Sequence, residues 1–298
     1  MIKKLSAYVK EYKTAAVLTS VMVMMEVVME VVIPRQMSKI IDIGLPGGDI
    51  GYVTKIGLIM ILMAVMSLCF GVGSGLNAAK AGAGFAKNLR QALFYKVQDL
   101  SFSNIDKFST SSLVTRLTTD VNNVQMAFTM MIRMLVRAPI MLVFATFMTV
   151  KISPRLSLIF FAVIPVLAVA LIFVMTKAMP KFRRMFRKYD VVNRVVQENL
   201  TNIRTVKAYV REDYETEKFK DASGDLYNNS IRAEKNTILV SPLMSTAVYS
   251  VMLAISWLGA HLIVSDSMTT GELMSMFTYV MQILSSLMMI SMSVVMMS

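Results

Sequence analysis

The feature that most constrains the fold of this chain is a set of long apolar runs without charged side chains. Four of these runs contain no Asp, Glu, Lys or Arg: residues 56–76, 156–175, 237–265 and 273–298. Each reaches the roughly 20 apolar residues that an α-helix needs to cross the hydrocarbon core of a bilayer. Two less uniform stretches, residues 15–33 and 138–150, are further candidate spans. The sequence therefore predicts an all-α, polytopic membrane protein with six transmembrane helices.

The charged residues make up 17% of the chain, against about 25% in soluble domains. They are concentrated in two stretches, because residues 80–137 and 177–235 together hold 22 of the 31 Lys and Arg. Both stretches contain little Gly or Pro and mix charged with apolar residues at helical spacing, which predicts long helical hairpins. Folded in half, the second hairpin would extend roughly 40 Å from the bilayer.

The distribution of basic residues predicts the side of the membrane that each segment occupies. With the N-terminus inside, 26 of the 31 Lys and Arg fall in the N-terminal segment and the two hairpins. This excess is the positive-inside bias of membrane proteins. We therefore expect a multi-pass protein of the cell (plasma) membrane, with its N-terminus and both hairpins in the cytoplasm. The same segregation explains the net charge of +12 without a nucleic-acid partner.

The N-terminal residues 1–12 are predicted to form an interfacial elbow segment, and residues 13–298 the six-span membrane domain. The apolar side chains of the elbow segment share one helical face: Leu5, Tyr8, Val9 and Tyr12. Lysines occupy its other faces, a pattern typical of a helix that lies at the membrane surface. Short turns are expected at three places on the other side of the membrane: residues 46–49, 151–155 and 265–271.

The tips of the two hairpins carry distinct local sequences. Ser and Thr crowd residues 109–112, where their hydroxyl groups can satisfy free backbone N–H groups as a helix restarts. The second tip carries an apolar stripe at helical spacing: Leu200, Ile203, Val206 and Tyr209. An apolar stripe outside the membrane either packs against neighbouring helices or docks into a groove of a partner. Periodicity alone leaves both interpretations open.

Glu26 and Glu30 are the main candidates for contact with a substrate. They lie one helical turn apart on the same face of the first span. A charged side chain near the middle of a bilayer costs about 2.5–3.5 kcal/mol. We therefore expect the two carboxyl groups to line a watery cavity, to pair with a Lys or Arg of another span, or to be protonated. Arg133 and Arg137, where the third span enters the bilayer, are expected to extend to lipid headgroups.

Other conspicuous residues favour packing roles over binding roles. The 29 methionines are expected mainly to fill gaps between helices, although a promiscuous binding pocket is the alternative. The glycine-rich segment 71–75 lies inside the second span and predicts close helix packing. Cys69 is the only cysteine and His261 the only histidine, so neither a disulfide nor a metal site is expected.

Five stretches carry a more specific pattern. They are Glu26-Val-Val-Met-Glu30 through Pro34 with Ile41-Asp42-Ile-Gly44; Phe108 through Arg116 with Asp120-Val121; Arg137-Ala-Pro139; Gln197-Glu198-Asn-Leu through Val206-Lys207-Ala-Tyr209 with Glu212; and Gly271-Glu272-Leu273. In order and spacing, over nearly the whole chain, they resemble the transmembrane domain of ABC exporters. This is the type with six spans per half and two coupling helices, which exports drugs, lipids or peptides.

The resemblance implies two coupling helices at the hairpin tips. The first comprises Ser109, Thr110, Ser111, Ser112, Leu113, Val114, Thr115 and Arg116. The second comprises Asn199, Leu200, Thr201, Asn202, Ile203, Arg204, Thr205, Val206, Lys207 and Ala208. Their implied partners are two ABC nucleotide-binding domains, which would supply the sites for ATP and Mg²⁺. A second transmembrane half, surrounding membrane lipid and a small amphipathic substrate are also implied, whereas no cofactor, metal or catalytic residue is expected in this chain.

The chain departs from the family pattern in three respects. It contains no G-x-x-x-x-G-K-[ST] phosphate loop, since none of its 13 glycines is followed by Lys. It also stops at Ser298 inside an apolar run, from which we expect a truncated sixth span, a missing nucleotide-binding domain and no ATP hydrolysis by this chain alone. Ser112 and Asn202 stand where the family commonly has glycine in the coupling turns.

These observations favour the membrane-spanning half of an ATP-driven exporter, which forms the substrate pathway and couples ATPase-domain closure to alternating access. One alternative is an ion-coupled secondary carrier that uses Glu26 and Glu30 as proton sites. That alternative leaves the apolar hairpin tips unexplained. The other alternative is a truncated fragment that transports nothing.

Overall fold

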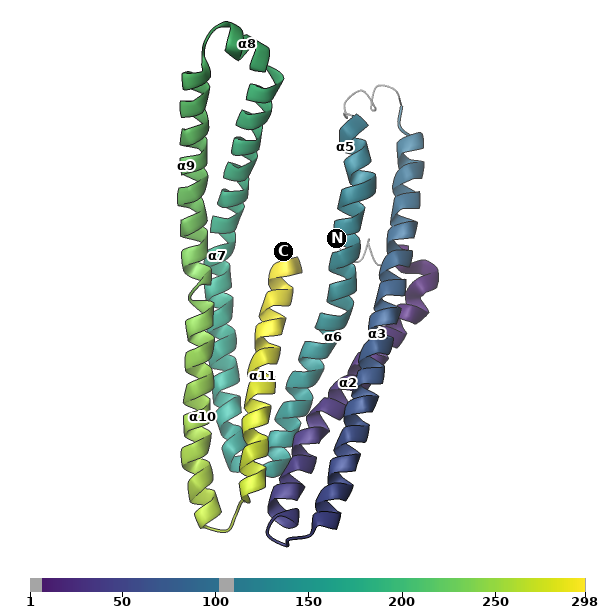
Figure 1. Cartoon of the computed structure of the whole chain (residues 1–298), viewed down its shortest axis with the longest axis vertical. Coiled ribbons are helices and arrows are strands. Elements are labelled where there is room, and N and C mark those ends of the chain that lie inside the picture. Colours follow the sequence, from purple (N-terminus) through teal and green to yellow (C-terminus); the bar gives the residue numbers. More distant parts are fainter. Residues whose placement is uncertain (1–6, 102–109, 298) are drawn as a thin grey trace. The chain divides into compact units, whose positions relative to one another are not determined.

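The structure is a computed structural model that describes residues 7–101 and 110–297. Its elements are helical (Figure 1): η1 Ala7–Tyr12, α2 Lys13–Lys39, η2 Ile40–Gly44, α3 Ile50–Gln98, α5 Thr110–Thr115, η3 Arg116–Asp120, α6 Val121–Ile152, α7 Pro154–Thr201, α8 Ile203–Ala208, α9 Glu212–Thr237, α10 Val240–Val264 and α11 Thr270–Met297. Six helical stretches of the described residues are long and apolar enough to cross a membrane. The prediction of an all-α, multi-pass membrane protein is confirmed.

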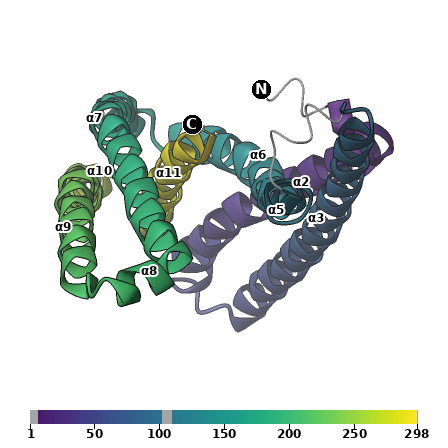
Figure 2. The ribbon, with the colours of Figure 1, turned by 90° about the horizontal axis from the view of Figure 1, so that it is seen from above.

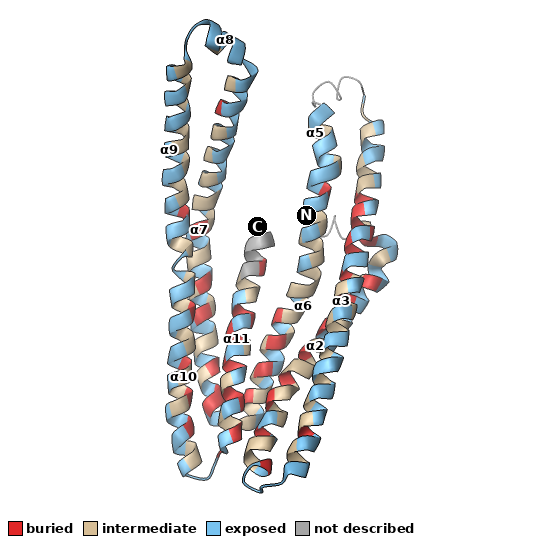
Figure 3. Cartoon of the chain, viewed as in Figure 1, coloured by how far each residue is buried: buried red, intermediate tan, exposed pale blue. Residues whose placement is uncertain are grey.

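The chain forms two compact units, and the first comprises residues 1–160 together with 251–298. In this unit α2 packs against α3, α6 and α11, and α11 also packs against α6. Buried residues follow these helices (Figure 3), with Val23, Val27 and Val31 recurring every fourth position along α2. This spacing places them on one helical face, so α2 presents a continuous apolar stripe to its neighbours.

The short helix η1 packs on α3 and α6. Val9 is buried in a cluster with Phe85, Leu89 and Val121, and Tyr8 and Tyr12 pack against this cluster. The apolar residues of the predicted elbow segment that are described therefore face protein. Leu5 lies outside the described residues.

The turns between spans form where the sequence signals predicted them. Gly48 adopts a positive φ of 60° in the loop after η2, and the Asp49 side chain then caps α3 by accepting a 2.9 Å hydrogen bond from the Tyr52 N–H. Only Ser153, in extended backbone, separates α6 from α7. Pro154 follows as the first residue of α7, a position where its missing N–H and fixed φ cost nothing.

The second unit comprises residues 161–250. Polar contacts along its length hold α7 and α9 together as a hairpin. Lys188 pairs with Asp225 at 2.6 Å and Lys218 with Glu198 at 2.8 Å. At the tip, α8 crosses from the end of α7 to the start of α9 (Figure 2). The predicted second hairpin is therefore a pair of long helices joined by a short crosswise helix.

The two hairpin tips differ in construction. The described part of the first tip begins with α5, which continues through the π-helical turn η3 into α6. The two helices α5 and α6 lie in line (Figures 1 and 2). Residues 110–116 of the first predicted coupling helix thus extend α6, and Ser109 lies outside the described residues. Residues 203–208 of the second form a helix separated from both of its neighbours.

Candidate functional site

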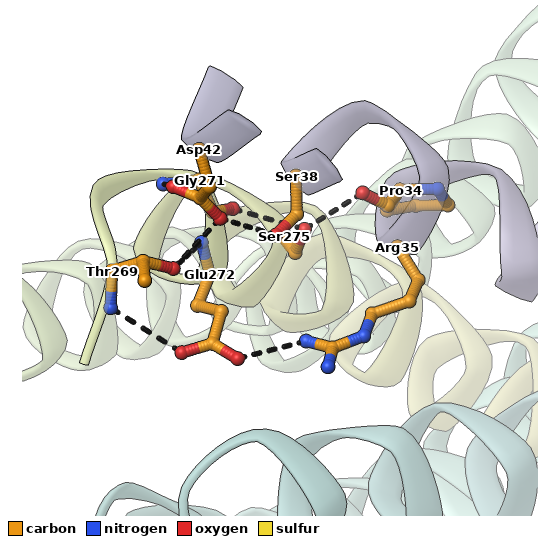
Figure 4. A network of polar contacts seen from close by, with 8 residues as sticks. All are labelled: Pro34, Arg35, Ser38, Asp42, Thr269, Gly271, Glu272 and Ser275. Atoms are coloured by element: carbon orange, nitrogen blue, oxygen red, sulfur yellow. Dashed lines mark hydrogen bonds and ion pairs between the residues drawn. The ribbon is translucent and has the colours of Figure 1, made fainter. Parts of the chain in front are cut away.

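Three groups of residues in the structure bear on function, and the first joins the end of α2 to the start of α11. Its centre is the Asp42 carboxylate (Figure 4), whose Oδ1 accepts a 2.7 Å hydrogen bond from the Gly271 backbone N–H. Asp42 Oδ2 accepts hydrogen bonds from the Thr269 hydroxyl at 2.7 Å and the Ser38 hydroxyl at 2.9 Å. We call these residues, with Arg35, Glu272 and Ser275, the Asp42 network.

The start of α11 favours a bound carboxylate because of its unpaired backbone N–H groups. The first N–H groups of a helix lack partners inside the helix and carry partial positive charge. Thr269 and Glu272 satisfy two of them as a capping box, in which the Glu272 N–H donates to the Thr269 hydroxyl and the Thr269 N–H donates to the Glu272 carboxylate, both at 3.3 Å. Asp42 adds a cap from a different helix. The signal for the capping box was present in the sequence, but its partner Asp42 was not predicted.

Further contacts extend the junction between α2 and α11. Arg35 forms an ion pair with Glu272 at 3.0 Å. The buried Ser275 hydroxyl donates a 2.7 Å hydrogen bond to the Pro34 carbonyl oxygen, as Figure 4 shows. A Cβ atom on Gly271 would lie 2.6 Å from both Asp42 Oδ2 and the Ser38 carbonyl oxygen. Only glycine allows this close approach without a shift of one helix.

The second group is an ion cluster between α2 and α6, which we call the Arg137 cluster. The Arg137 guanidinium pairs with the Glu26 carboxylate and, at 2.6 Å, with Glu30 Oε2. The Glu26 carboxyl group also lies against Gly71 of α3, whose Cβ position is 3.5 Å away. Of the alternatives for Glu26 and Glu30, pairing with a basic residue of another span is confirmed. The expectation that Arg137 extends to lipid headgroups is wrong, because two carboxylates hold its guanidinium inside the protein.

A cavity of about 300 Å³ adjoins this cluster. Its lining residues come from α2, α6 and α11: Glu30, Arg137, Ala138, Met141, Thr278, Met281, Gln282, Ser285, Ser286 and Met289. Ion-paired groups thus lie at one part of the wall, and thioethers and hydroxyls make up much of the remainder. Glu30 therefore belongs to the cavity wall as well as to the ion pair. Such a lining suits a ligand with both apolar and polar parts.

The third group is the tip of the second hairpin. A groove of about 340 Å³ is lined by residues from α7, α8 and α9: Val195, Val196, Asn199, Leu200, Ile203, Val206, Lys207, Glu212, Glu215, Thr216 and Phe219. Of the predicted stripe, Leu200 lines the groove yet leaves 65% of its surface exposed, and Tyr209, which is not among the lining residues, leaves 75% exposed. Part of the predicted apolar stripe therefore faces the groove, and part faces outward.

The backbone after α8 is held in a tight C-terminal motif. The Arg211 N–H donates to the Val206 carbonyl at 3.0 Å and the Val210 N–H donates to the Lys207 carbonyl at 3.3 Å. This pair of bonds is a Schellman motif, which needs a left-handed residue at its centre. Val210 fills that position with φ 51°, although β-branched residues rarely adopt it. The strained valine is 80% exposed, so no buried contact explains it.

Comparison with known proteins decides the family. Residues 17–287 match the family described as the ABC transporter transmembrane region. The chain belongs to this family. In an ABC transporter membrane region, the six apolar helices are transmembrane spans, as the sequence pattern indicated.

Curated relatives of this ABC transporter region come from several bacteria. An uncharacterized ABC transporter ATP-binding protein of Bacillus subtilis is 30% identical over 286 residues, covering 96% of this chain and 50% of the relative. One of Mycobacterium tuberculosis is 28% identical over 293 residues, covering 98% of this chain and 50% of the relative. An ATP-dependent lipid A-core flippase of Pseudomonas aeruginosa is 30% identical over 217 residues, covering 70% of this chain and 35% of the relative. The chain spans about half the length of the first two relatives.

Proposed function

We propose that this ABC transporter region is the membrane-spanning half of an ATP-driven exporter, which forms the substrate path and couples ATPase-domain closure to alternating access. The observation that carries this proposal is the crosswise helix α8, which stands at the end of a long hairpin beside an apolar groove. A transporter driven only from within its spans has no need for such a tip. The names of the relatives, which include ATP-binding proteins and an ATP-dependent flippase, support the same function.

In this proposal the hairpin tips transmit movement from two nucleotide-binding domains, which hold ATP and Mg²⁺. Residues 110–116 and 199–208 contact these domains, and no residue of this chain performs covalent chemistry. The ion pairs between α7 and α9 keep the second hairpin stiff. Because α7 continues from the hairpin into its apolar run, displacement of α8 moves a span as a rigid body. The N-terminus and both hairpins then lie in the cytoplasm, and a second transmembrane half completes the transporter.

The Asp42 network supplies a contact that differs between the two access states. Hydrogen bonds to Asp42 and the ion pair of Arg35 with Glu272 hold α2 and α11 together on the side opposite the cytoplasm. Opening of the path on that side separates these helices and breaks the network. ATP shifts the equilibrium toward the opened state only by the difference in its binding free energy between the two states of the transporter.

The cavity beside the Arg137 cluster is the proposed place for the substrate. Its methionines adapt to different apolar shapes, and Glu30 and Arg137 offer charged groups of both signs. A small amphipathic molecule fits this lining best. The ion pair keeps the two charged groups compensated while the cavity is empty.

Transport by this membrane region reconstituted with its nucleotide-binding domains in proteoliposomes tests the proposal. Uptake of an amphipathic dye that follows ATP and persists with a proton uncoupler supports it. Uptake that needs a proton gradient and ignores ATP supports the ion-coupled carrier instead. The control uses inactivated nucleotide-binding domains, with which both dye uptake and ATP hydrolysis should be lost.

A further inference from the structure

The cytoplasmic half of α7 carries a basic surface that the proposed coupling role does not use. A groove of about 420 Å³ is lined by Thr176, Met179, Pro180, Arg183, Arg184 and Arg187. At 100° per residue, these positions fall on one side of the helix. The three arginines are exposed, and none of them pairs with an acidic side chain of the described residues. We call Arg183, Arg184 and Arg187 the arginine face.

The neighbouring basic residues already have partners, which sets the arginine face apart. The Lys181 ammonium group donates a 2.9 Å hydrogen bond to the Asn236 side chain, and Lys188 pairs with Asp225. Lys177 lies over the ring of Phe173, 5.8 Å from its centroid. These three lysines hold α9 or the end of the apolar run. The three guanidinium groups of the arginine face are instead clustered on one groove and form no ion pair with the described residues.

The level of the arginine face relative to the bilayer follows from two apolar runs. The run within α7 ends at Met175, and the next run begins at Thr237, the last residue of α9 before α10. The hydrogen bond between Lys181 and Asn236 places the start of the second run beside Lys181, which follows the end of the first run on α7. Arg183 and Arg184 lie within one turn of Lys181, and side chains on a helix lean toward its N-terminus, here toward the bilayer. Arg183 and Arg184 are therefore expected near the level of the lipid phosphates, and Arg187 follows one helical turn farther along α7.

The same side of α7 stays apolar and exposed inside the membrane. Val169 and Phe173 expose 67% and 62% of their surface, and both fall within about 60° of Thr176 on the helical wheel. Acyl chains can lie along this stripe, while a phosphate meets guanidinium groups beyond it. A guanidinium binds phosphate through two parallel N–H donors, which a lysine cannot do.

We propose that the arginine face and the apolar stripe of Val169 and Phe173 form a binding site for one anionic phospholipid. The phosphate lies among Arg183, Arg184 and Arg187, and the acyl chains lie along α7. The site favours a headgroup with net negative charge, because a zwitterionic headgroup adds a cation that three arginines repel. The bound lipid would thereby fix the depth at which the second hairpin leaves the membrane.

Native mass spectrometry of the delipidated full-length protein in detergent tests this site. The probes are dioleoyl phosphatidylglycerol, dioleoyl phosphatidylcholine and free glycerol phosphate. The test variant is Arg183→Gln with Arg187→Gln. The matched control, Arg194→Gln with Lys220→Gln, removes two exposed charges of the same hairpin farther from the apolar run. A third variant, Arg183→Lys with Arg187→Lys, keeps both charges.

We expect the wild-type protein to bind phosphatidylglycerol more tightly than phosphatidylcholine. The Gln variant should weaken phosphatidylglycerol binding at least about five-fold, the control should leave it unchanged, and the Lys variant should lose less than the Gln variant. Equal binding of the two lipids, or an unchanged affinity in the Gln variant, would overturn the proposal. If free glycerol phosphate displaces phosphatidylglycerol as well as the lipid itself does, the site binds phosphate and does not require acyl chains. If the Gln variant binds lipid normally but no longer forms a dimer of two copies of the chain, the arginine face would be a protein contact, and the lipid site would be wrong.

Discussion

The Gly271 backbone N–H donates a 2.7 Å hydrogen bond to the carboxylate of Asp42, a residue 229 positions earlier in the chain. This bond joins the first described span to the last at their shared end. It depends on a glycine at the start of α11, because a Cβ atom there would lie 2.6 Å from the same carboxylate. The conformation of the two spans thus depends on one close contact.

Replacing Gly271 by Ala is expected to separate α11 from α2. The added methyl group must displace either Asp42 or the backbone of Ser38, at a cost of about 1–3 kcal/mol. Spin labels at the exposed positions Leu45 and Asp266, in a Cys69→Ala background, should report a longer or broader distance distribution. Gly224→Ala is the control, since nothing lies within 4 Å of that Cβ position; it should leave the distance unchanged. An unaltered distance in Gly271→Ala would contradict this role.

Replacing Asp42 by Ala is expected to lower the free energy of unfolding and to favour the separated state. The change leaves the Gly271 N–H and the hydroxyls of Ser38 and Thr269 without their acceptor, which costs about 1–3 kcal/mol. Thermal unfolding in detergent measures the loss. Asp49→Ala is the comparison, since it removes one capping bond to α3 and should cost about 1 kcal/mol. A smaller loss in Asp42→Ala than in Asp49→Ala would count against the network.

The sequence predicted the spans and turns because their signals are local. The 49 residues of α3 contain no proline, and Ser153-Pro154 marks a helix boundary by its own backbone chemistry. The partners of polar groups were harder to predict. The capping box of Thr269 and Glu272 is readable, but Asp42 lies 227 positions before Thr269 and no pattern connects them. For Glu26 and Glu30, pairing with a base was one of three alternatives that the sequence left open, and Arg137 was expected to extend to lipid instead.

The three residues of the Arg137 cluster are expected to contribute to stability together, so that their substitutions are not additive. Arg137→Met leaves two carboxylates facing each other without a cation. Loss of one partner costs about 3–5 kcal/mol in a fully buried ion pair, and less is expected here because the cluster is only partly buried. The variant should unfold at a lower temperature in detergent. Combining it with Glu26→Gln and Glu30→Gln removes the uncompensated charge and should restore most of the stability.

A triple variant no more stable than Arg137→Met would show that the guanidinium stabilises the spans by packing and not by charge. The double variant Glu26→Gln with Glu30→Gln, which retains Arg137, is the reciprocal control. It should also be less stable than the triple variant, because it leaves the guanidinium without its carboxylates. The three melting temperatures together distinguish charge compensation from side-chain volume.

Replacing Val210 by Gly should stabilise the turn after α8. A left-handed conformation costs a residue with a Cβ atom about 1–2 kcal/mol, and Gly adopts it freely. Hydrogen exchange followed by mass spectrometry should show slower exchange of the Arg211 amide, which closes the motif. Val210→Asn is expected to act in the same direction, since Asn tolerates this conformation better than Val. Faster exchange in both variants would contradict this, and would mean that the valine side chain itself stabilises the turn.

If α8 transmits force from a nucleotide-binding domain, it must contact that domain, and cross-linking at the hairpin tip tests this contact most directly. Thr205→Cys places a thiol on α8 in a Cys69→Ala background, and Lys220→Cys is the control on α9. In the intact transporter, Thr205→Cys should cross-link to the nucleotide-binding domain, and the cross-link should abolish ATP-dependent transport. Lys220→Cys should do neither. An intact, ATP-hydrolysing complex in which Thr205→Cys never captures that domain would contradict the account.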